Sequence, residues 1–230
     1  MLVKNWMSKK VIMIDANDSM QHAMNLMKEH KIRMLPVLKK DELVGVVSDT
    51  DLKRASASDA TTLDAHELLY LISKIKIKDI MTKNPVTVPL DHTIEETAEL
   101  LMSRKISGAP VVDEEGTVVG IITRDDLFKV LISLSGLGKK GIQFAFQIED
   151  RPGSIKNLTD IIRNFGGRIA SILSSYERVR SGFRIVYIRA YDVDRETLLR
   201  LVNELKRKAL MLYIVDHRDN KREIFHELSN

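Results

Sequence analysis

Two stretches of this sequence, residues 45–52 and 120–127, carry the same pattern 75 positions apart. In each, an apolar run that predicts a β-strand ends in a hydroxyl residue, and an aspartate follows three positions later. The pairs are Ser48 with Asp51 and Thr123 with Asp126. A chain that repeats so specific a spacing is expected to fold as two similar units.

The spacing has a chemical use, because a helix that begins after each strand directs its free N–H groups outward, where an anion can bind. Ser48 or Thr123 adds a hydroxyl donor, and Asp51 or Asp126 can accept hydrogen bonds from a neutral diol. Phosphate together with ribose is the simplest ligand that uses both. The structural alternative is an ordinary N-cap followed by a favourable first-turn acid. Because the spacing occurs twice, at equivalent points of a repeat, we favour ligand binding.

The repeat extends beyond these stretches. Apolar residues at helical spacing predict a helix in each copy, with Met20, Met24 and Met27 in the core of the first. Each copy therefore reads β-α-β-β-α in about 55 residues, too few to bury both helix faces alone, so we expect the copies to pack together. Helix N-termini are predicted at Asp18 with Gln21, a loose capping box, and at Thr93 with Glu96, a complete one. The matching segments are 3–7 with 77–81, 12–14 with 86–88, 34–38 with 109–112, and 43–48 with 118–123.

Repeat units of this order, with a hydrophobic-Pro-Val pattern at 35–37 and 109–111, resemble cystathionine β-synthase (CBS) domains. The pair, over residues 1 to about 135, resembles a Bateman module. That resemblance implies binding of adenosyl ligands (AMP, ADP, ATP or S-adenosylmethionine) in clefts between the repeats. It places ribose hydroxyls on Asp51 and Asp126 and phosphate on Ser48 and Thr123. It also places adenine against Ile12, Leu35 and Pro36 in one cleft and Val86, Ala109 and Pro110 in the other. Each proline is alternatively the start of an edge strand.

The two clefts differ in charge, because Asp49 follows Ser48 whereas Arg124 follows Thr123. Arg124 is therefore expected to meet phosphate. The cleft with Thr123 and Asp126 should prefer ADP or ATP, and the other should favour AMP or an uncharged adenosyl tail.

The predicted domains are a first repeat at 1–60, a linker helix at 61–76 and a second repeat at 77–135. Asp64 is expected to cap the linker helix, and His66, without a second ligand at metal-binding spacing, is expected on its surface. A basic, glycine-rich linker at 136–141 then precedes a different pattern. Residues 142–217 read β-α-β-β-α-β, a ferredoxin-like sandwich, and 218–230 read as a C-terminal tail. The fold class is thus mixed α/β (α+β).

Within residues 142–217, the run Asp150-Arg151-Pro152-Gly153 between the first strand and helix makes the segment resemble an ACT domain, a small amino-acid-sensing module. Gly153 lets a ligand approach the backbone, and the helix N-terminus beside it suits a carboxylate. The expected amino-acid contacts are Asp150, Gly153, Ser154 and Ile155. A Pro-Gly turn with Asp150 as a cap is the alternative. The sequence departs from that family at Arg168, where asparagine is common.

A CBS pair followed by an ACT domain, over nearly the whole length, resembles the acetoin-utilisation family AcuB. The resemblance implies a regulator of acetoin or acetyl-CoA metabolism that senses adenine nucleotide and possibly an amino acid. An enzyme is not expected, because the sequence has no Gly-x-Ser-x-Gly, His-Glu-x-x-His, Walker loop or cysteine nucleophile. No cofactor or metal is expected beyond the regulatory ligand.

Charge leaves a further alternative open. Residues 1–135 hold 18 Lys and Arg against 20 Asp and Glu, whereas residues 136–230 hold 18 against 12. The basic second half is compatible with nucleic-acid binding, but aromatic residues make up only 5% of the chain and offer few stacking platforms.

A dimeric adaptor without ligand response is another alternative. We expect at least a homodimer, with an unidentified regulated protein as its partner. With no apolar run of about 18 residues and no signal-like start, a cytoplasmic location is expected.

Overall fold

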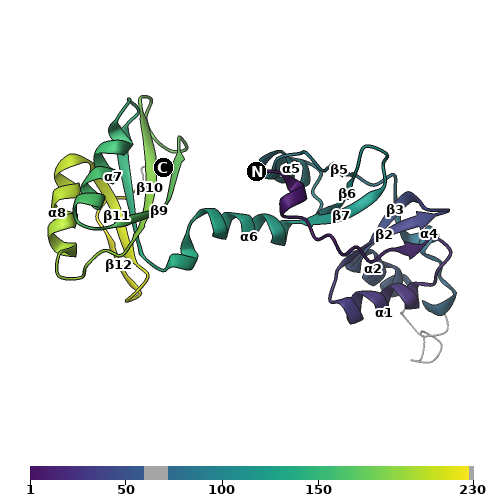
Figure 1. The fold of residues 1–230 in the computed structure, drawn as a ribbon. Helices are drawn as coiled ribbons and strands as arrows, with labels where there is room; N and C mark the ends of the chain where they lie inside the picture. Colours follow the sequence, from purple (N-terminus) through teal and green to yellow (C-terminus); the bar gives the residue numbers. More distant parts are fainter. Residues whose placement is uncertain (60–71, 228–230) are drawn as a thin grey trace. The chain divides into compact units, whose positions relative to one another are not determined.

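The computed structural model describes residues 1–59 and 72–227 (Figure 1). Its contacts divide the chain into two compact units, Met1–Phe128 and Lys129–Asn230. The predicted cap of the linker helix, Asp64, and the predicted surface residue His66 lie outside the described residues. Residues 72–74 are helical, and Ile72 is buried in the core of the first unit.

The first unit contains two small sheets, one from each repeat. Their strand orders are β1-β2-β3-β4 and β5-β6-β7, and in each the first strand runs parallel to the second while the rest pair antiparallel. The elements are η1 (Val3–Asn5), β1 (Ile14–Asp15), α1 (Met20–His30), β2 (Met34–Lys39), β3 (Glu42–Ser48), α2 (Asp49–Asp59), α4 (Ile77–Ile80), β4 (Thr82–Lys83), β5 (Val88–Pro89), α5 (Ile94–Ser103), β6 (Gly108–Val112), β7 (Val118–Thr123) and α6 (Arg124–Leu134).

The repeats exchange their leading segments. Strand β4, which opens the second repeat, pairs with Gly45 and Val46 in β3 of the first. In return, Ser8 near the start of the first repeat bridges Ile121 in β7 through N–H···O bonds of 2.9 and 3.0 Å. The predicted packing of the two copies is confirmed, and each sheet is completed by the other copy.

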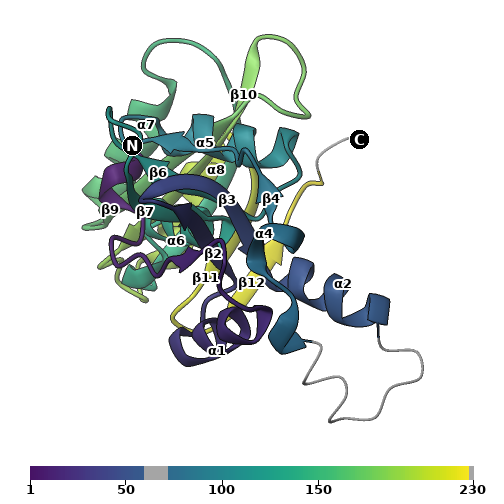
Figure 2. The same cartoon turned by 90° about the vertical axis from the view of Figure 1, so that its right-hand side faces the viewer.

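Helices α1 and α2 lie on one side of the first sheet, below β2 and β3 in two views a quarter-turn apart (Figures 1 and 2). Helix α1 begins at Ser19, whose Oγ accepts a hydrogen bond from the N–H of His22 at 3.2 Å, so the predicted box of Asp18 with Gln21 is wrong. The capping box of Thr93 with Glu96 at α5 is confirmed.

The predicted methionine core of α1 is right for two residues of three. Met20 is 0% and Met27 is 7% exposed, whereas Met24 is 37% exposed. Met24 lies one position after Ala23, at the margin of the apolar stripe, where helical spacing alone cannot separate core from surface.

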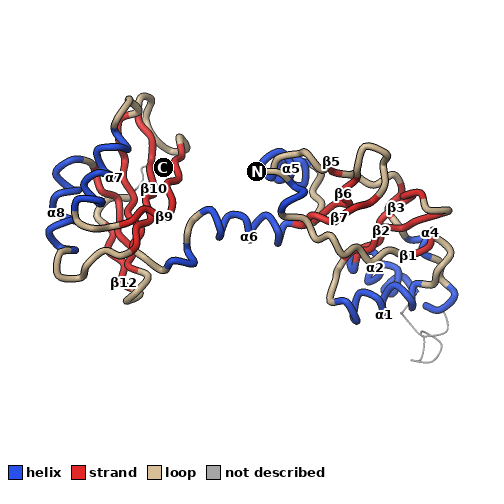
Figure 3. Tube along the Cα trace, viewed as in Figure 1, coloured by secondary structure: helices blue, strands red, loops and turns tan. Residues whose placement is uncertain are grey.

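The second unit is a single antiparallel sheet of order β12-β11-β8-β10-β9 (Figure 3). Numbered along the chain, its first four strands lie in the order 4-1-3-2, which is the predicted ferredoxin-like topology. Its elements are η2 (Leu137–Lys139), β8 (Ile142–Glu149), α7 (Ser154–Asn164), β9 (Arg168–Ser175), β10 (Phe183–Tyr191), α8 (Leu198–Lys208), β11 (Leu210–Asp216) and β12 (Lys221–Ile224).

Helices α7 and α8 cover one face of this sheet (Figure 1). Alternate residues of β8, among them Phe144 and Phe146, are fully buried against Leu158 of α7 and Leu201 of α8. Each such side chain contributes about 1.5–3 kcal/mol by burial, so this face stabilises the unit. The predicted tail is wrong in part, because β12 adds an edge strand to β11. All four residues of β12 are exposed, so the sequence has no apolar alternation there from which the strand could be predicted.

Candidate functional site

The first predicted ligand pair lies where β3 ends and α2 begins. The N–H and the Oγ of Ser48 both donate to Oδ2 of Asp51, at 2.9 and 2.6 Å, and the N–H of Asp51 donates to Oγ of Ser48 at 3.2 Å. This reciprocal arrangement is a capping box closed by an aspartate. Both side chains are partly buried.

The second pair repeats this geometry between β7 and α6. The N–H and Oγ1 of Thr123 donate to Oδ2 of Asp126 at 3.0 and 2.6 Å, and the N–H of Asp126 donates to Oγ1 of Thr123 at 3.4 Å. Asp126 is 6% exposed and therefore more deeply placed than Asp51. At both positions the structure thus shows the alternative of a helix cap, since each hydroxyl and aspartate that was predicted to bind ligand already takes part in one.

The caps leave fewer donors for an anion than the sequence predicted. The first N–H of α2, on Asp49, donates to the carbonyl of Arg33 at 3.0 Å, and the first N–H of α6, on Arg124, donates to that of Ser107 at 2.9 Å. The third N–H of each helix donates to the cap hydroxyl. The expectation of freely available N–H groups is therefore wrong for two of the first three positions.

The caps also decide which ligand atoms can bind without rearrangement. A hydroxyl has one proton, and that of Ser48 or Thr123 is directed at the aspartate. Oδ2 of each aspartate already accepts two hydrogen bonds, so a diol that leaves the cap intact must bond to the other carboxylate oxygen, and at Asp126 it must share the carboxylate with a further interaction. To bind a phosphate, the hydroxyl must instead turn so that it donates its hydrogen bond to the phosphate and no longer to the aspartate.

The predicted adenine residues lie beside these caps in the sheets. Leu35 and Pro36 pair with Val47 and Val46 of β3, directly before Ser48. In the second repeat, Ala109 and Pro110 pair in the same way with Ile122 and Ile121 of β7, directly before Thr123. Ile12 and Val86 each precede the parallel strand by two residues and are partly buried.

Burial divides these residues into two groups. Leu35 and Ala109 are 0% and 1% exposed, and both prolines are buried. Ile12 and Val86 are therefore the members of the two predicted adenine sets that keep exposed surface for a ligand.

Of the flanking charges, Asp49 forms an ion pair with Lys53, with 3.1 Å between Oδ2 and Nζ. Arg124 is exposed and has no ion-pair partner among residues 1–59 and 72–227. A separate cavity of about 640 Å³ lies in the first unit between the β2–β3 and β6–β7 turns. Its lining includes Asp41, Glu115 and Asn84 but none of the predicted nucleotide residues.

The predicted amino-acid residues lie at the start of α7. Gly153 is the N-cap, with φ +85°, a left-handed conformation that favours glycine. The alternative role of Asp150 as that cap is wrong, because its carboxylate lies 3.4 Å from Nε of Arg184 instead. Ile155 packs against the core of the unit.

Ser154 lines a cavity of about 470 Å³ with Asn157 of α7 and Lys208 at the end of α8. Asp150, Gly153 and Ile155 are not among its lining residues. Arg168, where the ACT pattern commonly has asparagine, lies over the ring of Tyr191 with its guanidinium carbon 5.3 Å from the centroid.

Sequence reasoning missed a buried polar group on β10. Arg189 is 4% exposed, and its Nη1 has no hydrogen-bond partner. Burial lowers the pKa of Arg189 below its usual value. The strand pattern offered no signal, since a lone arginine in an apolar run reads as solvated.

Two absences concern only residues 1–59 and 72–227. Within these ranges there is no group of three or more His, Cys, Asp and Glu side chains that could hold a metal ion. Among the same residues, no helix has the length and apolar character needed to cross a membrane.

The fold and the doubled cap together define a tandem pair of similar units, each with the same cap at the start of its second helix. The CBS domain family matches residues 3–58 and 77–133. An uncharacterized protein of Methanocaldococcus jannaschii is 32% identical over 155 residues, 57% of this chain and 92% of that protein. A CBS domain-containing protein of Dictyostelium discoideum is 32% identical over 134 residues, 58% of this chain and 92% of that protein.

Two solved structures are also similar. A CBS-domain containing protein of Agrobacterium tumefaciens is 23% identical with a TM-score of 0.50, over 57% of this chain and 100% of that one, and shows the same fold. A CBS domain pair crystallised with 5′-methylthioadenosine and S-adenosyl-L-methionine is 31% identical with a TM-score of 0.49, over 57% of this chain and 99% of that one.

This chain belongs to the CBS domain family, and its two repeats form the tandem pair called a Bateman module. CBS domains are in general regulatory modules.

Proposed function

We propose that this protein is a regulatory sensor that binds adenosyl ligands (AMP, ADP, ATP or S-adenosylmethionine) at its two hydroxyl–carboxylate pairs, Ser48 with Asp51 and Thr123 with Asp126. The observation that carries the proposal is the duplication of one cap geometry, to within 0.2 Å in each hydrogen bond, at equivalent points of both repeats. A helix needs only one ordinary cap hydrogen bond to begin. A carboxylate beside apolar residues, partly buried at Asp51 and buried at Asp126, suits a ribose diol next to an adenine ring.

The two parts of the ligand make different demands on the cap. The ribose diol donates to the aspartate and leaves the hydroxyl where it is. When a phosphate binds, the hydroxyl of Ser48 or Thr123 donates its hydrogen bond to the phosphate and no longer to the aspartate. One cap hydrogen bond is thereby replaced by a charge-assisted hydrogen bond at a helix N-terminus. The adenosyl part thus supplies recognition, and the phosphate supplies a change in the cap.

Calorimetric titration with AMP, ATP and S-adenosylmethionine tests the proposal. Asp51→Ala and Asp126→Ala should each remove one site, whereas the matched controls Asp49→Ala and Asp125→Ala, which remove a neighbouring first-turn acid, should keep both. Thermal unfolding accompanies each titration, because losing a cap costs about 1 kcal/mol by itself.

A ligand analogue makes the test sharper. 2′-Deoxy-AMP lacks one hydroxyl of the diol and should bind wild-type protein about tenfold more weakly than AMP, the equivalent of one hydrogen bond. In the variant that keeps a single aspartate, the same loss should persist at the remaining site. An unchanged two-site isotherm in both Asp→Ala variants would refute the nucleotide assignment.

We extend the proposal to the second unit as an ACT domain that senses an amino acid. Its support is the 4-1-3-2 strand order, the left-handed Gly153 before α7, and the cavity that both Ser154 and Lys208 line. A thermal-shift panel of amino acids tests it, since a ligand at 100 times its dissociation constant adds about 2.7 kcal/mol of stability. Ser154→Ala should abolish the shift, and Ser174→Ala on β9, outside the cavity, should retain it.

Two further parts of the proposal concern assembly and pathway. The first unit and α6 expose Met102, Phe128 and Leu131 at 73%, 59% and 57%, which favours at least a homodimer. Light scattering that gives a monomer at micromolar concentration would contradict it. The layout of a CBS pair followed by an ACT domain resembles the AcuB family, so the regulated process is proposed as acetoin or acetyl-CoA metabolism. Cells that lack this chain should then consume acetoin at an altered rate.

A further inference from the structure

Helix α6 carries the second hydroxyl–carboxylate pair at its first turn and a buried contact at its last. Beyond its final residue, the carbonyl of Ser135 accepts two hydrogen bonds, from Nε of Arg189 on β10 and from Oγ of Ser171 on β9, both at 2.7 Å. The N–H of Ser135 continues the helix by donating to the carbonyl of Leu131 at 2.9 Å. The end of α6 is therefore held by two strands of the second unit.

The holding residue is unusual in its environment. Arg189 is 4% exposed, and no carboxylate lies within ion-pair distance of it among the described residues. Its Nη2 donates to the amide oxygen of Gln143 at 3.1 Å, and its Nη1 has no partner. A buried cation without a counter-ion is destabilised by desolvation.

The carbonyls at the end of α6 supply the missing negative charge. The last turn of a helix carries a partial negative charge, and it stabilises a nearby cation most strongly in partly buried geometry. Gly136 completes the contact with φ +66°, and a Cβ atom on it would lie 3.0 Å from Cβ of Ala170. The charge of Arg189 and the end of α6 therefore stabilise each other. If the last turn of α6 unwinds, the buried charge of Arg189 loses the carbonyls that offset its desolvation.

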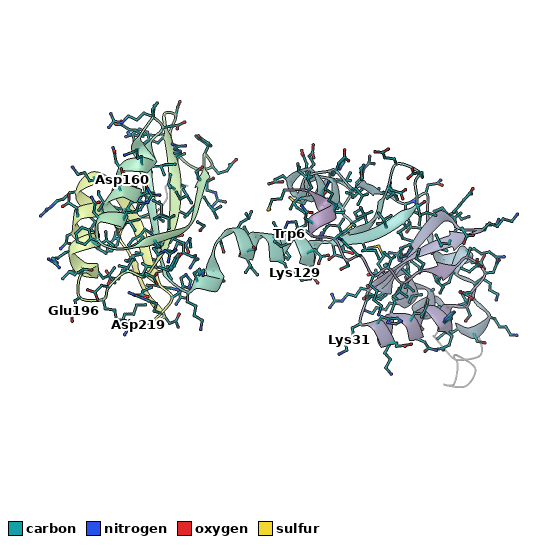
Figure 4. The ribbon with its side chains drawn as sticks, viewed as in Figure 1. Trp6, Lys31, Lys129, Asp160, Glu196 and Asp219 are labelled. Atoms are coloured by element: carbon teal, nitrogen blue, oxygen red, sulfur yellow. The ribbon has the colours of Figure 1, made fainter. Side chains whose placement is uncertain are left out.

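Nothing in α6 interrupts its continuity. The helix runs unbroken from Arg124 to Leu134 without glycine or proline, a length of about 16 Å at 1.5 Å per residue. Lys129, labelled in Figure 4, lies on it near the middle, where the first unit gives way to the second. Helix formation is cooperative, so a change in stability at the first turn is felt at the last.

We propose that α6 couples the Thr123–Asp126 site to the second unit. Arg189 is the positioning residue, because it donates a hydrogen bond to the Ser135 carbonyl at the end of the helix. The inference rests on the proposed function, because it takes an adenosyl phosphate as the effector. A phosphate at the first turn stabilises α6 from its N-terminus, and the strengthened helix holds the Ser135 carbonyl on Arg189 and Ser171. The two states required for coupling are the helix end bound to Arg189 and the helix end released.

Hydrogen exchange of the full chain, with and without ATP, tests the coupling. In the wild type, ATP should slow exchange in the first turn of α6 and also in β9 and β10 around Ser171 and Arg189. Arg189→Met should retain the protection of the first turn and lose that of β9 and β10. Ser171→Ala, a milder change that removes the other donor to the same carbonyl, should reduce the distant protection partly, and Arg184→Met, on the same strand, should leave it unchanged.

A pair of double variants isolates the helix itself. Leu131 and Ile132 are 57% and 52% exposed, so replacing both changes few packed contacts within the chain, and the two double variants remove the same exposed side chains. Leu131→Gly with Ile132→Gly weakens the helix relative to Leu131→Ala with Ile132→Ala, because glycine has a much lower helix propensity than alanine. The glycine pair should abolish the ATP response of β9 and β10, and the alanine pair should retain it. Equal responses in the two double variants would overturn the proposal.

Linkage supplies a second readout. If ATP strengthens the contact at Arg189, then loss of that contact must weaken ATP binding, and Arg189→Met should lower affinity about fivefold at the Thr123–Asp126 site alone. Protection of the first turn without any change in β9 and β10 overturns the coupling and leaves the nucleotide site standing. Absence of both protection and binding heat refutes the proposed function, and the coupling with it.

Discussion

The sulfur atom of Met81 lies 2.5 Å from the position that a Cβ atom on Gly45 would occupy. Gly45 is in β3 of the first repeat, and Met81 precedes β4, the strand that the second repeat contributes to the same sheet. The reciprocal contact joins Met7 of the first repeat to Gly120 of the second. The exchange of leading segments thus depends on a methionine from each repeat fitting over a glycine of the other.

The two glycines should differ in their tolerance of alanine. A Cβ atom on Gly45 would also lie 2.9 Å from the backbone carbonyl of Thr82, whereas the three atoms nearest to one on Gly120 would all belong to the side chain of Met7. We expect Gly45→Ala to destabilise the first unit by about 1–3 kcal/mol through overpacking. Gly120→Ala should be close to neutral, because Met7 can move and the unfolded chain loses about 0.4–1 kcal/mol of entropy.

Double-mutant cycles check the cause, with unfolding followed by the fluorescence of Trp6, the one tryptophan. Met7→Ala should couple to Gly120→Ala, because its removal clears the whole contact. Met81→Ala should restore Gly45→Ala only in part, since the Thr82 carbonyl stays. Full restoration by Met81→Ala would show that the backbone is not the obstacle.

Acidification should destabilise the second unit through His217. Its Nε2 is buried without a hydrogen-bond partner, and its pKa is lowered by burial first and then by the positive charges of Arg189 and Arg222, against the opposing charge of Asp216. The unfolded chain takes up this proton near its ordinary pKa, about 6.5, and the folded chain only at lower pH. The stability is therefore present above about pH 6.5 and is lost as the pH falls from there through the folded pKa.

Urea unfolding between pH 5 and 7.5, followed by tyrosine fluorescence, measures this loss, because Tyr176, Tyr187, Tyr191 and Tyr213 lie in the second unit. His217→Gln should flatten the pH dependence, and His226→Gln, at an exposed position, should leave it as in the wild type. A slope that survives His217→Gln would assign the titration to another group.

The backbone at Gly153 should limit substitution even though space is available. No atom lies within 4 Å of a Cβ built there, but its φ of +85° is strained for an L side chain. Gly153→Ala should therefore cost about 1–3 kcal/mol. Gly138→Ala, equally uncrowded and without a positive φ, should be near neutral by the same urea measurement.

Short-range chemistry made most of the fold predictable. The predicted strand at 118–123 has the observed bounds, because its apolar run and the turn before it are local signals. The Thr93 cap was predictable for the same reason. At α1, Ser19 displaced Asp18 because both are good caps in adjacent positions, and only the path of the chain decides between them.

Long-range pairing was not predictable in this way. The exchange of β4, the edge strand β12 and the burial of Arg189 each depend on a distant partner: Gly45, β11 and the Ser135 carbonyl. None leaves a periodic mark in its own segment. The caps are an intermediate case. The sequence shows the spacing of each hydroxyl and aspartate, but it does not show that the two side chains hydrogen-bond to each other.

The two proposed nucleotide sites should differ in their preference for charged ligands, and the difference should come mainly from one of them. Asp49 beside the first site is already paired with Lys53, whereas Arg124 beside the second is exposed and has no ion-pair partner in the described chain. The extra phosphates of ATP therefore gain a cation at the Thr123–Asp126 site and meet a largely compensated acid at the other. A partly exposed pair is worth about 1 kcal/mol, or roughly a fivefold preference.

Calorimetry on single-site backgrounds measures this preference. With Asp51→Ala, which leaves the second site, the ratio of ATP to AMP affinity should be about fivefold higher than with Asp126→Ala, which leaves the first. Adding Arg124→Gln to Asp51→Ala should bring the two ratios together, and Arg104→Gln at the end of α5 should not. High salt should also narrow the difference, because exposed charges are screened. Equal ratios in the two backgrounds at low salt would show that Arg124 points away from the phosphates, and that the sites differ only in the depth at which Asp51 and Asp126 are buried.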